Sequence, residues 1–260
     1  MKESWQIDPQ FRQEFLDFCE LAASDDEVFK TFKENDRIKT IIENSTEDHK
    51  KKTIEWHNPK HPGDIRWWND LTPTEVRYLY LTILIETKLF KNFQRTGDIV
   101  EIGGGYGGQC EMFQRISHTH GAYTIYDIPQ VQKLQARFLG DHAIYPIFPD
   151  GIPEATEHDL LISWCAWSEL DINTRKEYVE KVILKAKRFI ICSNYNFYED
   201  LGILYSYGIA PKIYSDELYS NIIYYKLKFL HQVNVHPNIN QFLFTDPSQN
   251  SDPSQNPNCP

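Results

Sequence analysis

Five of the six residues from Gly103 to Gly108 are glycine, and they directly follow the short apolar run "DIVEI". A strand that leads into a glycine-rich turn and then a helix is the usual way to hold a nucleotide-like cofactor against backbone N–H groups. The stretch "DIVEIGGGYGGQC" therefore predicts a β-strand, a cofactor-binding turn and the start of a helix. The turn alone leaves the identity of the cofactor open.

Short apolar runs alternate with helical segments from Asp98 onward. The runs are "DIVEI", "AYTIYD", "AIYPIF", "DLLISW", "RFIICS", "YYKLKFL" and "QFLFT". Between the second and third runs lies "PQVQKLQARFLG", which Pro129 opens and Gly140 closes, as expected of a helix. This alternation predicts a parallel sheet with helices on both faces. The spacing of the last two runs permits an antiparallel hairpin at the sheet edge.

The chain divides into three predicted parts. Residues 1–92 should form a helical lobe that caps the substrate site, because "PQFRQEFLDFCELAA" has an apolar stripe and Thr72 and Glu75 have capping-box spacing around Pro73. Residues 93–245 should form the cofactor-binding α/β domain. Residues 246–260 repeat the pentapeptide Asp-Pro-Ser-Gln-Asn and lack apolar content, which predicts a disordered tail.

Charge, apolar content and cysteine spacing narrow the ligands and the location that the sequence predicts. The net charge of -10 disfavours a nucleic-acid ligand, since non-specific affinity for nucleic acids comes from Lys and Arg neutralising phosphates. No apolar stretch has the length of a signal peptide or a membrane span, so we expect a soluble, cytoplasmic protein. The five cysteines are scattered without a CxxC pair, which predicts reduced core thiols and suggests no zinc site, and the sequence shows no other cluster of metal ligands.

The glycines fit two cofactor motifs. Gly103, Gly105 and Gly108 satisfy the G-x-G-x-x-G dinucleotide fingerprint, with Asp127 about 20 residues further on to bind a ribose. The stretch "EIGGGYG" equally satisfies E-x-G-x-G-x-G, the first motif of class I methyltransferases that use S-adenosylmethionine. A dinucleotide brings a pyrophosphate, whereas S-adenosylmethionine brings positive sulfonium and ammonium groups that suit an acidic lining. Glu101 at the end of the first strand and Asp150 after the third supply carboxylates for such a lining, although a solvated strand-end charge is the alternative for Glu101.

Three segments carry a more specific resemblance. "TPTEVRYLYLTILIETKLF…GDIVEIGGGYGGQC", "YTIYDIPQVQKLQARFL" and "DLLISWCAWSELD", in that order, resemble the sugar O-methyltransferase family of bacterial surface-glycan clusters. The resemblance runs from about Pro62 to about Phe244. It implies a Rossmann-like class I methyltransferase fold, S-adenosylmethionine as cofactor, and a sugar, nucleotide-sugar or glycan acceptor.

The resemblance also assigns the cofactor site. It implies that Glu101 and the first glycines line the methionine end of S-adenosylmethionine and that Asp127 holds the ribose hydroxyls. Ile128 would lie beside the adenine, and Asp150 near its exocyclic amine. Independently, a carboxylate at the carboxyl end of the second strand is well placed to hold a vicinal diol. The predicted cofactor residues are Glu101, Gly103, Gly104, Gly105, Tyr106, Asp127, Ile128, Asp150 and Ser163.

Methyl transfer to a sugar hydroxyl requires a general base, because the hydroxyl is a poor nucleophile until its proton is leaving. Ligands in open α/β sheets lie at the carboxyl ends of strands. Four histidines precede strands instead and are expected at the surface, namely His118, His120, His142 and His158. Glu169 is our first candidate for the base and His236 our second. The alternatives are a helix-dipole role for Glu169 in the first turn of the next helix, and a plain surface role for His236.

The segment "LLISWCAW" also resembles the corresponding segment of plant-type small-molecule O-methyltransferases, but those enzymes carry a catalytic histidine where this chain has Trp167. That base is therefore not transferable. Trp164 and Trp167 fit either core packing or a platform for the apolar face of a sugar. Trp67 and Trp68 fit either packing of the helical lobe onto the sheet or a wall or lid of the site. An NAD-dependent oxidoreductase and a non-catalytic interaction module stay as alternative functions, and the oligomeric state is left undetermined.

Overall fold

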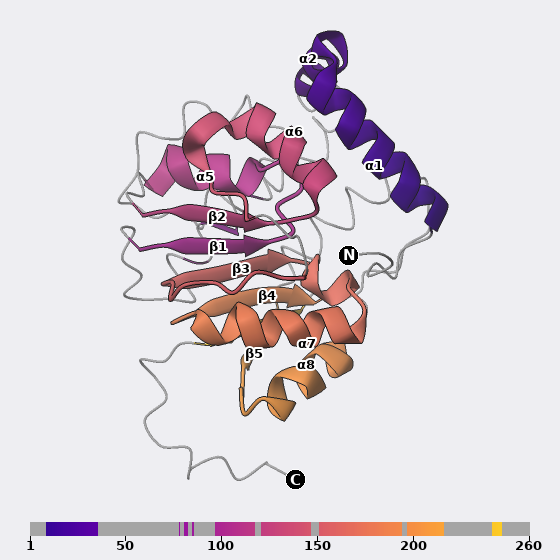
Figure 1. Ribbon diagram of the computed structural model, residues 1–260. Helices are drawn as coiled ribbons and strands as arrows, with labels where there is room; N and C mark the ends of the chain where they lie inside the picture. Colours follow the sequence, from indigo (N-terminus) through magenta and orange to yellow (C-terminus); the bar gives the residue numbers. More distant parts are fainter. Residues whose placement is uncertain are drawn as a thin grey trace.

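The computed structural model describes residues 9–35, 78, 81, 82, 85, 97–117, 121–146, 151–193, 197–215 and 241–245. Within them one sheet has the strand order β2-β1-β3-β4-β6-β5 (Figure 1). The first four strands of this order run parallel, and β6 runs antiparallel to both β4 and β5. The strands are β1 (Ile99–Ile102), β2 (Tyr123–Tyr126), β3 (Leu160–Trp164), β4 (Phe189–Ser193), β5 (Lys212–Ser215) and β6 (Gln241–Thr245).

The helices begin and end where the sequence provides suitable caps. Pro129 opens α6, where the missing proline N–H is not needed, and Gly140 closes it with φ 60° and an N–H bond to the Ala136 carbonyl. Asp171 caps α7 by accepting the N–H groups of the second and third residues of the helix. The helices are α1 (Pro9–Ser24), α2 (Asp26–Asn35), α5 (Gly108–Ser117), α6 (Pro129–Leu139), α7 (Ile172–Lys181) and α8 (Phe197–Ser206), with 3-10 turns η4 (Gly140–His142), η5 (Trp167–Glu169) and η6 (Ile183–Lys185).

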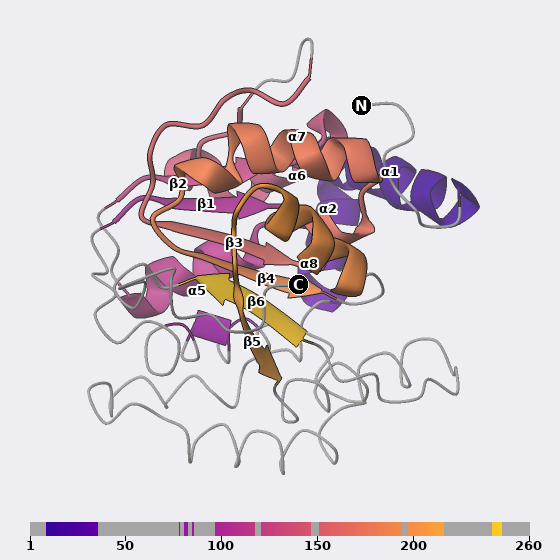
Figure 2. The ribbon, with the colours of Figure 1, turned by 90° about the horizontal axis from the view of Figure 1, so that it is seen from below.

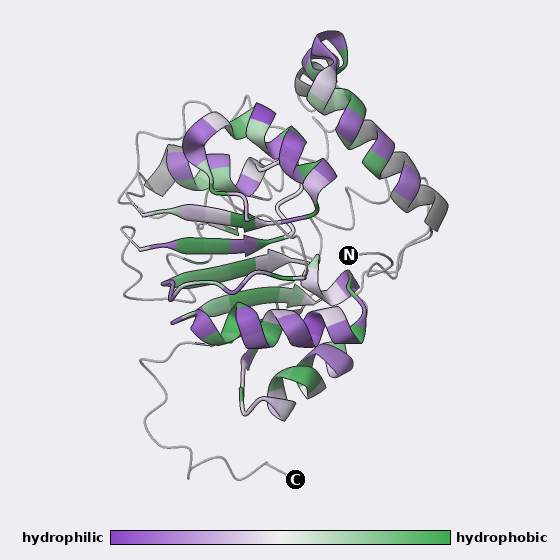
Figure 3. Ribbon diagram, in the orientation of Figure 1, coloured by the Kyte–Doolittle hydropathy of each residue, from purple (hydrophilic) through white to green (hydrophobic). Residues whose placement is uncertain are grey.

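Helices cover both faces of the sheet (Figures 1 and 2), and an apolar core lies between the sheet and the helices on each face. On one face α5 packs together with Tyr78, Leu81 and Ile85. On the other face α7 and α8 pack together. The central strands are buried on both sides, as expected of parallel strands, and they form the hydrophobic middle of the molecule in Figure 3. The predicted Rossmann-like α/β sheet with helices on both faces is therefore confirmed.

A third apolar cluster joins the N-terminal helices to α6. Cys19 and Ala22 of α1 are buried against Ile128, Val131 and Leu134. In Figure 1, α1 lies on the side toward which the arrows of β1 and β2 point. The N-terminal helical part therefore reaches the end of the sheet at which ligands of such folds bind.

The sheet ends in an antiparallel pair, as the sequence permitted, but the partner of β6 differs from the one considered. β6 lies between β4 and β5, so strands other than the run "YYKLKFL" occupy both of its hydrogen-bonding edges. The edge strand β5 has the sequence "KIYS", which is too short and too polar to stand out as an apolar run. Over the described residues 143–146 of the predicted strand "AIYPIF", the pairing is an isolated bridge between Ile144 and Thr124.

Several predictions lie outside the described residues. They are the capping box around Pro73, the run 224–230, Trp67 and Trp68, and the tail 246–260. None of the helices that the structure describes is long and apolar enough to cross a membrane.

Candidate functional site

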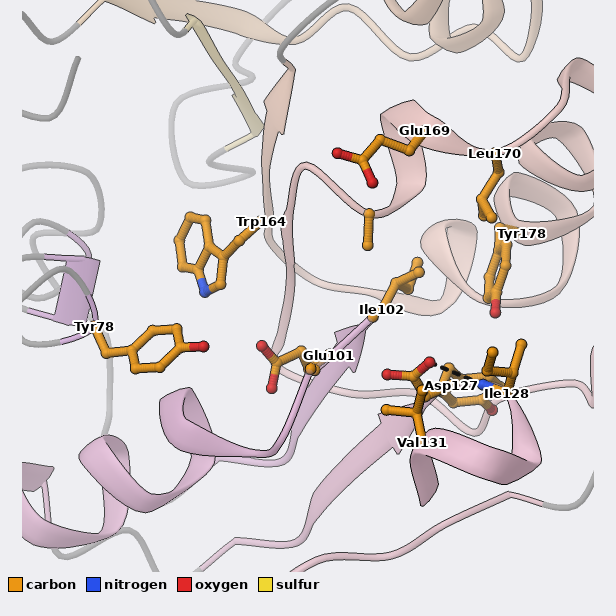
Figure 4. Close-up of a pocket in the computed structure, with 15 residues that line it drawn as sticks. Tyr78, Glu101, Ile102, Asp127, Ile128, Val131, Trp164, Glu169, Leu170 and Tyr178 are labelled. Atoms are coloured by element: carbon orange, nitrogen blue, oxygen red, sulfur yellow. Dashed lines mark hydrogen bonds between the residues drawn. The ribbon is translucent and has the colours of Figure 1, made fainter. Parts of the chain in front are cut away.

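A cavity of about 230 Å³ opens at the carboxyl ends of β1, β2 and β3 (Figure 4). This is the end of an open parallel sheet at which ligands are bound. Its walls come from the glycine-rich turn after β1, the start of α6 after β2, and the η5 turn after β3. The lining residues are Tyr78, Glu101, Ile102, Gly103, Gly104, Gly105, Tyr126, Asp127, Ile128, Val131, Trp164, Ala166, Glu169, Leu170 and Tyr178.

The glycines after β1 serve two different purposes. Gly103 has φ 73°, and a Cβ there would lie 2.0 Å from the Cβ of Ala166, so glycine is required where this turn meets the turn after β3. Gly105 has φ 55° and open space where a Cβ would be. The later glycines instead allow close packing, because a Cβ on Gly107 would meet Leu139 and one on Gly108 would meet two tyrosine rings. Only the first three glycines therefore form the floor of the cavity.

Glu101 is a buried acid rather than the solvated strand-end charge that we considered as an alternative. Its side chain is 1% exposed, and Oε2 accepts a 2.8 Å hydrogen bond from the hydroxyl of Tyr123. Burial, together with the nearby Glu101 charge, raises the pKa of Tyr123 well above its ordinary value, so this hydroxyl stays a donor at neutral pH. The pair presents a negative group at the inner wall of the cavity.

Asp127 is held by several donors at the end of β2. Oδ1 accepts the Ile128 N–H at 2.9 Å, Oδ2 accepts Nε2 of Gln135 at 2.9 Å, and the backbone of Gly104 and Gly105 adds further hydrogen bonds. Nε2 of Gln135 also donates to the Gly105 carbonyl at 2.8 Å, which ties the glycine turn to the acid. Burial outweighs these donors and raises the pKa of Asp127 to about 7.

Glu169 faces the cavity from the opposite wall, on η5 (Figure 4). It precedes Asp171, the cap of α7, so it does not lie in the first turn of that helix as the alternative required. In Figure 4, Glu169, Leu170 and Tyr178 lie on one side of the cavity. Tyr78 lies on the other side, with its hydroxyl turned toward Glu101. The cavity thus combines three acids with aromatic walls.

Some predicted site residues lie elsewhere. Ser163 is fully buried, where its hydroxyl donates to the Ile102 carbonyl and accepts the Trp167 N–H, both at 3.1 Å. Tyr106 is absent from the cavity lining and packs edge-on against Phe138 with ring centres 5.0 Å apart. Asp150 and His236 fall outside the described residues.

The two tryptophans at and after the end of β3 have different roles. Trp164 lines the cavity, whereas Trp167 is fully buried and donates from its indole N–H to the Arg175 carbonyl at 3.2 Å. Trp167 is therefore a core residue and not a platform at the cavity. Trp164 is the last residue of β3 and Trp167 the first residue of η5, and nothing in the sequence "SWCAW" says which one faces the ligand.

The prediction that His158 lies at the surface was wrong. It is 3% exposed at the amino end of β3, its Nδ1 lies 2.9 Å from the Thr156 carbonyl, and burial lowers its pKa. His142 is exposed, as predicted. His158 still lies at the end of the strand away from the cavity, while His118 and His120 fall outside the described residues.

Sequence reasoning missed Tyr78, Val131, Leu170 and Tyr178 as lining residues. Apolar and aromatic side chains on amphipathic helices, such as those of Tyr78, Val131 and Tyr178, have the same pattern whether they face a core or a cavity, so the sequence carries no signal for them. Leu170 follows η5 in extended conformation, and no motif includes it. Within the described parts of the chain, no group of three acidic, histidine or cysteine side chains is arranged to hold a metal ion.

No protein-family model and no curated protein sequence matches the chain. The chain is similar to several solved structures at low identity. A SAM-dependent methyltransferase from Aquifex aeolicus is 13% identical, with 75% of this chain and 96% of that one covered at a TM-score of 0.42. A SAM-dependent O-methyltransferase from Thermotoga maritima is 16% identical, with 57% and 58% covered at a TM-score of 0.38. At these values the likeness carries no argument about function, which must come from the cavity itself.

Proposed function

We propose that the protein is an S-adenosylmethionine-dependent O-methyltransferase that methylates a hydroxyl of a sugar or glycan. The observation that carries the proposal is the placement of Glu101 and Asp127 on either side of an open glycine turn at the carboxyl ends of β1 and β2. This arrangement suits a ligand that has a positive charge at one end and a ribose diol at the other.

The residues present fit that cofactor. Glycines 103–105 line the cavity, with open space where a Cβ of Gly105 would be, and Asp127 offers the two oxygens that a vicinal diol requires. Ile128 and Val131 form an apolar wall next to Asp127, which suits an adenine ring. When bound, S-adenosylmethionine supplies a methyl group on a positively charged sulfur. Glu101 would then balance the charge at the methionine end.

The same cavity is a poorer fit for a dinucleotide. A pyrophosphate is normally held at the N-terminus of the helix after the glycine turn. Gly108, the first residue of α5, is buried, and the rings of Tyr78 and Tyr106 lie where its Cβ would be. The described lining also has three acids and no Lys or Arg, which would repel a pyrophosphate. These contacts favour S-adenosylmethionine over NAD.

The other half of the cavity supports a sugar acceptor. Trp164 and Tyr78 provide aromatic surface, on which the apolar C–H face of a sugar can stack. Glu169 faces the same space and, as a carboxylate, can accept the proton that the acceptor hydroxyl loses during transfer. The remaining task of these residues is to align the hydroxyl and exclude water.

Calorimetry of the protein with S-adenosylmethionine and with NAD tests the cofactor. We expect S-adenosylmethionine to bind and NAD not to, and Asp127→Ala to weaken binding through loss of the ribose contact. A screen of nucleotide sugars and glycans, read by the 14-dalton mass gain of a methyl group replacing a proton, tests the acceptor. Binding of NAD alone would overturn the cofactor assignment. Cofactor binding without any methylated acceptor would favour a non-catalytic module.

A further inference from the structure

A buried ion pair lies directly beneath the turn that carries Glu169. Arg175 of α7 and Asp200 of α8 are both fully enclosed, and Nη1 of the arginine lies 2.6 Å from Oδ1 of the aspartate. Arg175 also pairs with the more exposed Glu199. A buried ion pair is weak evidence for net stability, because desolvation of both charges offsets their attraction. The pair is therefore better explained by the residues that it holds in place.

The ion pair anchors both residues that precede Glu169 on η5. The hydroxyl of Ser168 hydrogen bonds to the Asp200 carboxyl and lies 3.5 Å from the hydroxyl of Ser193. The Ser193 hydroxyl in turn donates to Oδ2 of Asp200 at 2.5 Å. The Trp167 indole N–H donates to the backbone carbonyl of Arg175 at 3.2 Å, and the carbon of the Arg175 guanidinium lies 6.0 Å from the centre of the Trp167 ring. All of these side chains are buried. The anchor thus links η5 to α7, α8 and β4.

The turn needs such an anchor because its backbone is strained. Cys165, between β3 and η5, has φ 71°, a left-handed conformation that a non-glycine residue keeps only when its surroundings enforce it. Ala166 is wedged against Gly103, and the Glu169 N–H bonds back to the carbonyls of Cys165 and Ala166, both at 3.2 Å. One end of the turn is therefore fixed by the glycine turn after β1, and the other by the ion pair.

We propose that Arg175 and Asp200, acting through Trp167 and Ser168, are positioning residues that aim the Glu169 carboxylate at the acceptor hydroxyl. This inference rests on the proposed function, in which Glu169 takes the proton of that hydroxyl. Displacement of a catalytic group by about 1 Å can cost on the order of 100-fold in rate. Loosening the anchor should therefore slow turnover while the cofactor half of the cavity stays intact.

Ser168→Ala is the mildest test, because it removes one hydroxyl from the anchor without emptying a large volume. We expect kcat to fall roughly 10-fold or more, with KM and the dissociation constant of S-adenosylmethionine nearly unchanged. Ser206→Ala is the matched control, since its hydroxyl bonds only locally to the Ile203 carbonyl at the exposed end of α8. That control should keep the wild-type kcat.

The same substitution in a Glu169→Gln background separates positioning from general damage. If Ser168 acts through Glu169, its loss should cost little once the carboxylate has gone, because the two effects are not additive. An equal loss of kcat in both backgrounds, or full activity of Ser168→Ala, would overturn the proposal. Melting temperatures of the wild-type protein, the Ser168→Ala and Glu169→Gln variants and the double variant show whether each is folded.

Hydrogen exchange gives a readout that does not depend on turnover. Ser168→Ala should speed exchange of the Glu169 and Leu170 amides, whose hydrogen bonds close η5, and leave the amides of β1 and β2 unchanged. Asp200→Asn should do the same where it folds. Unchanged exchange in the turn would overturn the anchor even in an active enzyme. A wild-type protein that methylates no acceptor would overturn the proposed function instead, and exchange would still decide whether the anchor exists.

Discussion

The hydroxyl of Tyr123 donates a 2.8 Å hydrogen bond to Oε2 of Glu101, and both side chains are closed off from solvent. A buried carboxylate is costly unless donors compensate it. β2 therefore supports the acid of β1 from a position two residues away in the register of the neighbouring strand, since Tyr123 pairs with Ile99 and Glu101 pairs with Ile125. Glu101, the first residue of the glycine motif, is thus stabilised by Tyr123, a residue that neither cofactor motif includes.

Tyr123→Phe should lower the free energy of unfolding by about 1.5–3 kcal/mol, the usual contribution of a hydrogen bond to a charged group. It should also weaken S-adenosylmethionine binding, because Glu101 becomes harder to keep ionised. Tyr145→Phe is the matched control, since among the described residues no partner is found for the Tyr145 hydroxyl. Urea unfolding and calorimetry measure both effects. Equal stability of the two variants would show that the Tyr123 bond contributes nothing.

Asp127 should make stability depend on pH in an unusual direction. Its pKa rises from an ordinary 3.8 to about 7 in the folded protein, so between these values the native state keeps a proton that the unfolded chain has released. Unfolding then releases a proton, and stability must fall as pH rises from about 4 to about 7. The difference between wild-type and Asp127→Asn unfolding free energies, measured across this range, isolates the effect. A difference that does not change with pH would contradict it.

The opposite trend is expected for the cofactor. Ribose hydroxyls donate hydrogen bonds, so they should favour the ionised form of Asp127, and affinity for S-adenosylmethionine should increase as pH rises through about 7. Calorimetric titrations at several pH values test this. Asp127→Asn should bind weakly with little pH dependence. Tighter binding of the wild-type protein at low pH would place the ribose elsewhere.

The strands with continuous apolar runs were predictable, because a parallel strand buried on both faces needs such a run. The edge was not, since "KIYS" pairs on one side only and carries little apolar signal. Glu101, Asp127 and Glu169 could be placed at the cavity because Glu101 lies at the carboxyl end of a strand and the other two follow strands. Whether Trp164 or Trp167 faces the cavity depends on the strained turn at Cys165, and a strained turn leaves no pattern in the sequence.

Gly103→Ala should destabilise the protein more than Gly105→Ala. Both glycines have positive φ, but only at position 103 would a Cβ collide, with the side chain of Ala166. Each substitution incurs the backbone cost of a left-handed residue, about 1–2 kcal/mol, and the difference between them measures the collision. Ala166→Gly should restore much of the stability of Gly103→Ala. Lack of rescue in the double variant would mean that the two turns do not meet as described.

Arg137 should hold the N-terminal helices against α6. Nη1 donates to the carbonyls of Ala22 and Asp25 at 3.2 and 3.1 Å, and the guanidinium pairs with Asp26 and lies 4.3 Å from the Phe29 ring centre. Arg137→Ala leaves the carbonyls at the end of α1 without this donor. Proteolysis and hydrogen exchange should then show α1 opening well before the sheet. Exchange of α1 that is unchanged in the variant would contradict this role.

The identity of the base is decided by two matched variants. Glu169→Gln keeps size and hydrogen bonding but cannot accept a proton at neutral pH, so turnover should fall by about 10²- to 10⁴-fold with little change in cofactor affinity. His236→Asn is the rival variant, and a histidine base would make wild-type activity fall as pH drops through about 6.5. We expect the Glu169 variant to be impaired and the His236 variant to be active, because the structure brings Glu169 to the cavity wall. The reverse pattern would make His236 the base. Full activity of both would mean that the proton leaves to water or to the substrate itself, even if the cofactor binds as proposed.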